Sequence, residues 1–315
     1  ESGIKAVNEH LRRCGLNGYA ESSSVHPNVY RLHYEIKGNP LISIIIPNKD
    51  HIVDLSRCID SILQKSTYLN YEIIIVENNS TQKETFEYYE KIQKKDNIQV
   101  KVYETHGEFN YSAINNFGVK YAKGEHILLL NNDIEIISNS WLEEMLMFSQ
   151  REDVGAVGAK LYYPNNTIQH AGVILGIGGV AGHSHKYFDR SATGYMSRCF
   201  IQQDLSAVTA ACLMMKKSVF EQVNGLDEEN FKVAFNDVDL CMKIRKAGYL
   251  IVWTPYAEAY HYESISRGTE DTPEKQARFK GEAEAFMIKW KKELELGDPY
   301  YNQNLTLERE DFSIN

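Results

Sequence analysis

The chain has 315 residues, of which 43% are hydrophobic and 24% are charged. These proportions are typical of globular proteins, and the length suffices for one large domain or two small ones. The formal net charge of -9 argues against nucleic acid as the main partner, because binding to a phosphate backbone favours a basic surface. No apolar run approaches the roughly 20 residues that span a bilayer, and the sequence shows no signal peptide.

The chain contains five cysteines, an odd number, and no CxxC pair. This pattern argues against a disulfide framework and against a zinc ribbon, and a reducing cytoplasmic setting fits it best. The sequence begins at Glu1 without methionine, which leaves room for a longer native protein with further domains.

The first 38 residues predict a helical lead-in followed by an extended segment. Apolar residues recur at helical spacing over 4–14, and residues 29–36 alternate like a strand. This region carries no recognisable chemistry, so we expect it to serve as a docking surface for a preceding domain.

From Pro40 onward, short apolar runs alternate with amphipathic stretches. This alternation predicts βαβ units with right-handed crossovers, and therefore an α/β fold with a parallel sheet. The predicted strands are 41–46, 71–76, 99–103 and 127–130, and the predicted helices between them are 53–64, 81–94 and 111–122.

Polar clusters follow three of these strands, at 47–48, 77–79 and 131–133. In open α/β sheets ligands bind at the carboxyl edge of the strands. A carboxylate there, Asp133, suits Mg2+ or Mn2+ carrying a diphosphate. One such cluster could simply be a turn that ends a strand, but three together favour a nucleotide pocket.

The second half is less regular. It predicts a helix at 141–149, one or two short strands in 154–163, a strand over 168–175, a strand over 210–216 and a short helix at 218–223. A further helix begins with Asp237 and Asp239 and ends before Gly248. These two acids suit either helix capping or a general base with its orienting partner. A strand at 251–253 is expected to stop at Pro255, and a long charged helix covers 272–292.

Two further patterns bear on cofactor binding. The run 176–181 reads G-x-G-x-x-A after a strand, but neither an amphipathic helix nor an acidic strand end follows, as a dinucleotide site requires. His170, His183 and His185 have no carboxylate or thiol at zinc-site spacing. We expect the loop over about 176–206 to form part of the acceptor side.

Six segments occur in one characteristic order and spacing: PLISIIIPNKD (40–50), YEIIIVENNS (71–80), FNYSAINNFG (109–118), GEHILLLNNDIEI (124–136), FNDVDLCMKIRKAGY (235–249) and AYHYESISRG (259–268). With them, the chain resembles the family-2 glycosyltransferases of the GT-A fold, the bacterial kind that builds surface polysaccharides or glycoprotein glycans. The tail DPYYNQNLTL (298–307) also looks like this subgroup.

The resemblance implies a fold and a domain plan. The fold is α/β of GT-A type, with a Rossmann-like, mostly parallel central sheet flanked by helices, a helical N-terminal lead-in and a C-terminal helix. The expected parts are the lead-in 1–38, the glycosyltransferase domain 39–270 and the C-terminal helix and tail 271–315. The domain would divide into a nucleotide-binding half, 39–137, and an acceptor and catalytic half, 138–270.

The resemblance also implies roles for individual residues. Asp133 would bind the metal, Mn2+ or Mg2+, and His261 matches a histidine that completes the metal site in some relatives. Asn131 stands where many members have aspartate, which weakens the direct metal contact at that position. Asp237 matches the catalytic base, with Asp239 as its neighbour. The expected donor nucleotide-binding residues are Pro47, Asn48, Glu77, Asn79, Asn116, Asn131 and Asn132.

These roles describe an inverting transfer of a sugar from a UDP- or dTDP-sugar to a hydroxyl of a growing glycan, on a lipid-linked or glycoprotein acceptor. A divalent ion would neutralise the leaving diphosphate, and Asp237 would deprotonate the attacking hydroxyl. The implied location is cytoplasmic, or peripheral at the inner face of the membrane. The alternatives are a non-catalytic nucleotide-sugar or glycan-binding module of a larger synthase and a nucleotidyltransferase, with a dehydrogenase as a remote third.

Overall fold

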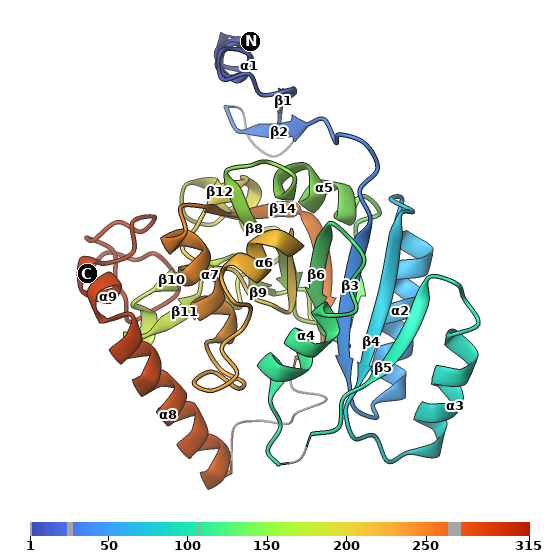
Figure 1. Ribbon diagram of the computed structural model, residues 1–315. Coiled ribbons are helices and arrows are strands. Elements are labelled where there is room, and N and C mark those ends of the chain that lie inside the picture. Colours follow the sequence, from blue (N-terminus) through green and yellow to red (C-terminus); the bar gives the residue numbers. More distant parts are fainter. Residues whose placement is uncertain (1, 24–27, 106, 264–271) are drawn as a thin grey trace.

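The computed structural model describes residues 2–23, 28–105, 107–263 and 272–315. Within these residues, ten strands form one sheet in the spatial order β12-β14-β8-β13-β6-β3-β4-β5, with β7 paired to β14 and β9 to β8 (Figure 1). The strands are β3 (Ile42–Asn48), β4 (Tyr71–Glu77), β5 (Ile98–Val102), β6 (His126–Leu130), β7 (Ile134–Ile136), β8 (Val154–Tyr162), β9 (Ile168–His170), β12 (Gln203–Asp204), β13 (Cys212–Lys216) and β14 (Leu250–His261).

The strands β3, β4, β5 and β6 pair in parallel, because a helix connects each of them to the next and returns the chain to the same end of the sheet. β13 enters between β6 and β8 and runs antiparallel to both, whereas β14 runs parallel to β8. Most of the paired residues belong to parallel ladders, which confirms the predicted α/β class with a mostly parallel central sheet.

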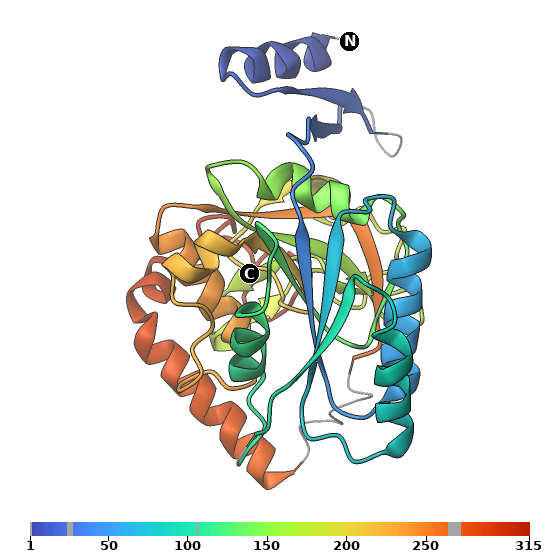
Figure 2. The same ribbon diagram turned by 45° about the vertical axis from the view of Figure 1, so that its right-hand side comes forward.

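Helices cover both faces of this sheet, which explains why its strands are almost entirely apolar. Figure 2 shows helices on both sides of the sheet. Alternate residues of one strand face opposite sides, so Ile44 packs toward α2, α3 and α5, while Ile45 packs toward α4, α6 and α7. The helices are α2 (Ile52–Lys65), α3 (Lys83–Ile92), α4 (Tyr111–Val119), α5 (Trp141–Ser149), α6 (Lys217–Gln222) and α7 (Asn236–Lys246).

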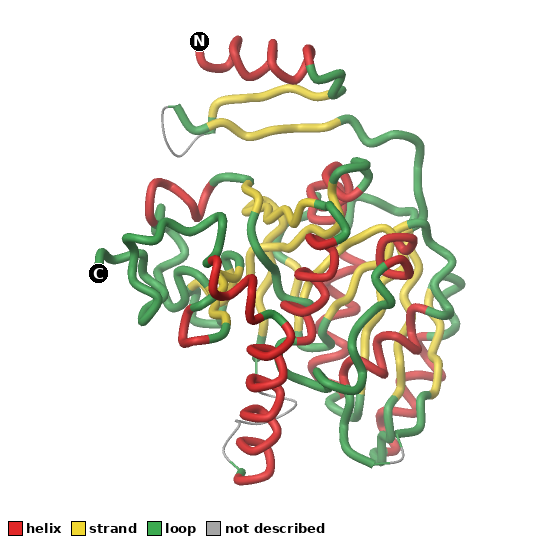
Figure 3. Tube along the Cα trace, turned by 60° about the vertical axis from the view of Figure 1, so that its left-hand side comes forward, coloured by secondary structure: helices red, strands yellow, loops and turns green. Residues whose placement is uncertain are grey.

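The N-terminal segment forms a small unit at one end of the body (Figures 1 and 3). It consists of helix α1 (Ser2–Arg13) and an antiparallel hairpin of β1 (Gly18–Ser22) and β2 (Tyr30–Tyr34). Arg31 pairs with Glu144 of α5 and stacks on Tyr256 of β14. The sequence predicted the helix and the second strand but missed β1, a short polar strand that depends on its partner. The proposed docking role of this unit stays a prediction.

Two strand predictions for the second half were wrong in detail. Residues 168–175 are not one strand, because Gly172 turns the chain at a φ of +96° and separates β9 from β10 (Val173–Leu175). The strand at 251–253 does not stop at Pro255 but continues through it to His261. The pairing with β8 shifts register between Trp253 and Glu258, so the ladder is already interrupted where proline lacks an N–H.

The C-terminal helix is also interrupted. Trp290 leaves helical geometry and separates α8 (Pro273–Lys289) from α9 (Lys291–Leu296). The tail beyond it packs Leu305 and Phe312 against Ile174 and Ile177, next to the hairpin of β10 and β11 (Ala181–His183). Two short 3-10 helices, η1 (Ile177–Gly179) and η2 (Tyr195–Phe200), lie between the strands of this half. In the part of the chain that the structure describes, no helix has the length and apolar character needed to cross a membrane.

Candidate active site

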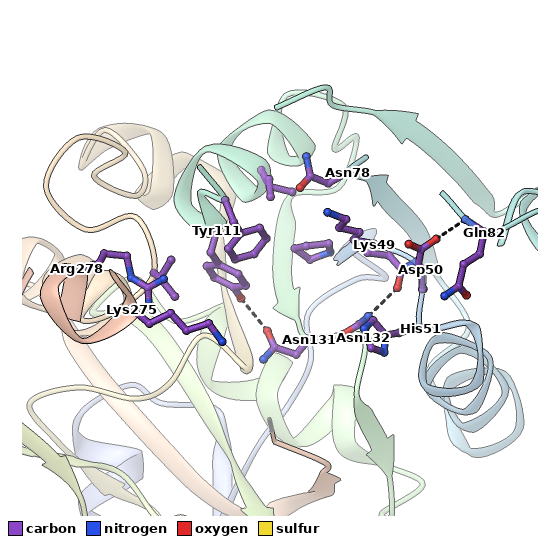
Figure 4. A pocket seen from close by; sticks show the side chains of 15 residues that line it. Lys49, Asp50, His51, Asn78, Gln82, Tyr111, Asn131, Asn132, Lys275 and Arg278 are labelled. Atoms are coloured by element: carbon purple, nitrogen blue, oxygen red, sulfur yellow. Dashed lines mark hydrogen bonds between the residues drawn. The ribbon is translucent and has the colours of Figure 1, made fainter. Parts of the chain in front are cut away.

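A cavity of about 410 Å³ opens at the carboxyl ends of β3, β4 and β6, the edge where ligands bind in α/β sheets (Figure 4). Its walls come from the segments after these strands, from α4 and from α8. The polar residues at its wall include Asn48, Lys49, Asp50, His51, Asn78, Gln82, Tyr111, Asn131, Asn132, Lys275 and Arg278.

The predicted donor-binding residues Pro47, Asn48, Asn131 and Asn132 all line this cavity. Asn132 donates to the side-chain oxygen of Asn48 at 2.7 Å, and Asn48 donates to the hydroxyl of Tyr89 at 2.8 Å. These bonds fix the amides that end two neighbouring parallel strands, so their orientation is set before any ligand arrives.

Glu77 lies behind the cavity wall. Its buried carboxylate accepts from Tyr89 at 2.7 Å and from the backbone N–H and hydroxyl of Ser80, each at 2.6 Å. Two other predicted donor residues also point elsewhere. Asn79 exchanges hydrogen bonds with Thr105, and Asn116 holds the turn at Leu226. Asn78, which was not selected, lines the cavity instead.

The charge of the cavity differs from that of the whole chain. Lys49 and His51 come from the β3 end, and Lys275 and Arg278 come from α8. Among the described residues, the lining contains one carboxylate, that of Asp50, and it accepts from the backbone N–H groups of Thr81 and Gln82, both at 2.9 Å. Burial raises the pKa of Asp50, but these hydrogen bonds outweigh it and hold the pKa below its ordinary value. The cavity therefore favours an anionic ligand.

Lys275 and Arg278 were not among the predicted site residues, although both lie in the predicted charged helix. They stand three positions apart, so they share one helix face, and this spacing is a signal in the sequence. Whether that face meets solvent or a cavity depends on where α8 packs, which the sequence alone does not show. In Figure 4 both side chains reach from α8 toward the wall that carries Asn131 and Tyr111.

Asp133 and His261 lie side by side, although 128 positions separate them. β7, which follows Asp133, pairs with β14 so that Ile134 stands opposite His261. His261 Nε2 lies 3.3 Å from a carboxylate oxygen of Asp133 and 3.3 Å from Nδ2 of Asn131, and all the contacts are buried or partly buried. The predicted metal residues are therefore adjacent.

The donor set fits a cation such as Mn2+, which accepts carboxylate oxygen, amide oxygen and imidazole nitrogen. Among the described residues, no group of three or more His, Cys, Asp or Glu side chains could hold a metal ion. A cation held by Asp133 and His261 would therefore need further ligands besides these two side chains.

Asp237 is connected to the cavity through the backbone of one residue, Ala210. Its Oδ2 accepts from the N–H of Ala210 at 3.1 Å, and the carbonyl of Ala210 accepts from the Tyr111 hydroxyl at 3.2 Å. The same hydroxyl lies 3.0 Å from Oδ1 of Asn131. Asp237 is partly exposed at the start of α7, where its Oδ1 accepts from the N–H of Val238 at 2.8 Å.

Asp239 does not join Asp237. Its side chain is fully buried, where it accepts from the indole N–H of Trp290 at 2.8 Å and pairs with Lys289 at 2.8 Å and Lys243 at 3.5 Å. Positions two apart on a helix point roughly 200° apart, a signal that could have separated these acids from the sequence. The structure gives Asp239 the role of tying α7 to α8.

The patterns set aside in the sequence have structural explanations. The glycine run forms the turn η1 rather than the start of an α-helix. His185 stacks on Phe312, away from the other two histidines, while His170 and His183 contact each other. All five cysteines are free thiols.

A comparison with family models matches residues 43–223 to "Glycosyl transferase family 2". The chain is 47% identical over 314 residues to an uncharacterized Sinorhizobium fredii protein, y4gI, covering all of this chain and 34% of that protein. It is 40% identical over 318 residues to the O-antigen biosynthesis protein RfbC of Myxococcus xanthus, of which it covers 24%. The chain thus spans only about a third and a quarter of these relatives.

Two solved structures share the fold. A Pyrobaculum calidifontis mannosyltransferase in complex with GDP-Man and Mn2+ matches with a TM-score of 0.58 and 14% identity, over 91% of this chain and 72% of that chain. GalNAc-T7 with UDP, GalNAc and Mn2+ matches with a TM-score of 0.64 and 13% identity, over 87% and 53% respectively. The predicted GT-A fold is confirmed. With its family match spanning more than half of the sequence, the chain belongs to glycosyl transferase family 2 and is a glycosyltransferase.

Proposed function

We propose that this chain transfers a sugar from a UDP- or dTDP-sugar to a hydroxyl of a growing surface glycan, with inversion at the anomeric carbon. The observation that carries the proposal is the cationic cavity at the sheet edge, whose Asn131 connects through Tyr111 and Ala210 to the carboxylate of Asp237. The name of the Myxococcus relative, an O-antigen biosynthesis protein, supports an O-antigen type of acceptor, and a lipid-linked glycan would bring the domain to the inner face of the membrane.

In the proposed donor site, the nucleoside lies among Pro47, Asn48 and Asn78, and the diphosphate extends toward Asn131 and Asn132. Lys275 and Arg278 approach from the opposite wall and supply positive charge to the phosphates. Arg278 suits this role because its guanidinium offers paired N–H groups to phosphate oxygens. Glu77, Asn79 and Asn116 would act indirectly, by holding the loops around the site.

Asp133 and His261 would hold a divalent cation, Mn2+ or Mg2+, together with the diphosphate. Such an ion neutralises negative charge on the leaving group. Asn131 contributes no charge at its position, so the cations on α8 supplement the neutralisation.

Asp237 would accept the proton of the acceptor hydroxyl, which then attacks the anomeric carbon from the side opposite the diphosphate. One bond forms between the acceptor oxygen and the anomeric carbon as the bond to the phosphate oxygen breaks. A single displacement inverts the configuration and needs no covalent nucleophile. Asp239 would contribute by fixing α7, not by contacting substrate.

The test is a thermal-shift screen of UDP-, dTDP- and GDP-sugars, each with Mn2+ or with EDTA, on wild type, Asp133→Ala and the exposed control Asp60→Ala. A ligand at a hundred times its Kd stabilises the native state by about 2.7 kcal/mol, which is readily measured. We expect one nucleotide to raise the Tm with Mn2+ in wild type and in the control, but not in Asp133→Ala. No shift with any donor would refute the donor site, and an equal shift in EDTA and in Asp133→Ala would refute the metal role.

A further inference from the structure

The two peptides before β13 hold two different functional groups. The N–H of Thr209 donates to Nε2 of His170 at 3.4 Å, and the next N–H, of Ala210, donates to Asp237 at 3.1 Å. The imidazole of His170 and the carboxylate of the proposed base are therefore fixed by neighbouring amides of one rigid, buried segment.

His170 in turn contacts a second histidine. Its Nδ1 lies 2.9 Å from Nδ1 of His183, and the rings meet edge to face with centroids 5.0 Å apart. His170 ends β9 and is fully buried, whereas His183 ends β11 and is partly exposed. The pair therefore leads from the Thr209 peptide to the partly exposed ring of His183, on which the charge of Asp237 acts.

These contacts fix the position of each proton. Nε2 of His170 accepts a hydrogen bond from an amide, so the proton of its neutral ring must sit on Nδ1. That Nδ1–H can only donate to Nδ1 of His183, which must then accept. His183 consequently carries its own proton on Nε2, the nitrogen directed away from His170.

The charge state of both rings agrees with this assignment. Burial lowers the pKa of His170 well below its ordinary value, and it lowers the pKa of His183 to about 4 even though the Asp237 charge opposes the shift. Both rings are therefore neutral near neutral pH. Among the described residues, no hydrogen bond joins Nε2 of His183 to a protein group, and the residue is partly exposed.

We infer that His183 binds the acceptor sugar, donating from Nε2–H to the hydroxyl that Asp237 deprotonates, with His170 as the positioning residue that sets its tautomer. This inference rests on the proposed function and adds a specific acceptor contact to it. The hydroxyl oxygen accepts one hydrogen bond from His183, donates its proton to Asp237 and keeps a lone pair for the anomeric carbon. Such an arrangement orients the nucleophile before attack.

The tautomers can be tested without knowing the substrate. Protein labelled with 15N at histidine distinguishes Nδ1–H from Nε2–H through long-range 15N–1H correlations, and His170→Gln and His183→Gln assign the signals. We expect a neutral Nδ1–H tautomer for His170 and a neutral Nε2–H tautomer for His183. The opposite tautomers, or a charged imidazolium in this pair at neutral pH, would overturn the inference.

Kinetics test the acceptor contact. The variants are His183→Met, which keeps the length without a donor, His183→Gln, which places an amide N–H near the position of Nε2, and the remote control His10→Gln. The probes are the nucleotide-sugar found in the thermal screen and a panel of octyl glycosides of common hexoses. We expect His183→Met to lower acceptor kcat/KM by about ten- to a hundredfold, as for one lost hydrogen bond to a reacting group, with donor KM unchanged.

His183→Gln should restore most of this loss, and His10→Gln should match wild type. If donor KM rises by the same factor by which kcat/KM for the acceptor falls, or if glutamine does not restore activity, the role of His183 is merely structural and the inference is overturned. The proposed function is judged separately by Asp237→Asn. If that variant loses transfer while His183→Met retains it, only the inference falls; if wild type transfers to no glycoside and to no water, the proposed function fails and the acceptor role falls with it.

Discussion

Asp239→Asn should destabilise the protein without removing its chemistry. The carboxylate is fully buried and accepts from Trp290 while balancing Lys289 and Lys243. Asparagine keeps the shape and can still accept from the indole, but it leaves two cations facing a neutral amide. The substitution should therefore lower the free energy of unfolding of the protein, because it weakens the contact between α7 and α8.

The magnitude follows from what the lysines retain. Removing one partner of a fully buried pair costs about 3–5 kcal/mol. Lys289 keeps Asp227 at 2.9 Å and its side chain is 35% exposed, while Lys243 keeps the carbonyl of Gly225. These residual contacts reduce the expected loss to about 2–3 kcal/mol.

Urea denaturation followed by circular dichroism measures this loss, and kcat is measured well below the lowered Tm. The matched control is Glu284→Gln, an exposed carboxylate on α8 whose pair with Lys280 should contribute less than about 0.5 kcal/mol. Asp237→Asn should show the opposite behaviour, with stability nearly intact and kcat reduced by at least about a hundredfold. A stable Asp239→Asn variant that loses kcat would refute this division of roles and restore Asp239 as a catalytic candidate.

Three further outcomes are expected. Arg278→Gln should raise the KM for the donor by about tenfold, because it removes a charge-assisted contact. Lys280 is exposed on the same helix, so Lys280→Gln should leave the donor KM unchanged. Equal effects of the two substitutions would contradict the position of α8 beside the donor. Burial lowers the pKa of His126 to about 4, so the folded state disfavours protonation of this ring. The unfolded chain binds that proton below about pH 6.5, so the free energy of unfolding should fall as the pH drops from about 6.5 toward 4. Urea titrations should show a loss of about 1–3 kcal/mol over this range. His126→Asn should flatten this part of the pH profile, and an unchanged slope would contradict its cause. Gly158→Ala would place a Cβ 2.5 Å from the Cβ of Val208 and should cost about 1–3 kcal/mol of stability, measured by denaturation. The double variant with Val208→Gly, which removes the clashing Cβ, should recover part of that loss, and strict additivity would contradict the steric explanation.

The central strands and the polar ends of three of them could be predicted because both are local signals. Apolar runs such as 41–46 are buried on both faces wherever they lie in the sheet, and a turn cluster directly after the run marks the carboxyl edge. Asp133 was found in this way, and Asp237 by its place at the start of a helix. Family resemblance then supplied the roles that geometry alone does not assign.

Other features depend on partners distant in sequence. β1 is short and polar, so only its pairing with β2 makes it a strand. Pro255 is tolerated because the register shift against β8 removes the need for its N–H. The position of Arg278 at the cavity depends on the packing of α8, which the buried Asp239 helps to fix. Neither the packing of α8 nor the burial of Asp239 can be predicted from a short window of sequence.

The place of β14 in the sheet decides where the domain can be cut. The family match ends at residue 223, which suggests a minimal fragment of 43–223. β14 lies beyond that point and covers one edge of β8, so such a fragment would leave a long apolar strand with unpaired N–H and C=O groups. Open edges of this kind recruit other chains. A fragment ending there would lack Asp237 and His261 and would also aggregate, and useful truncations must retain the chain through β14.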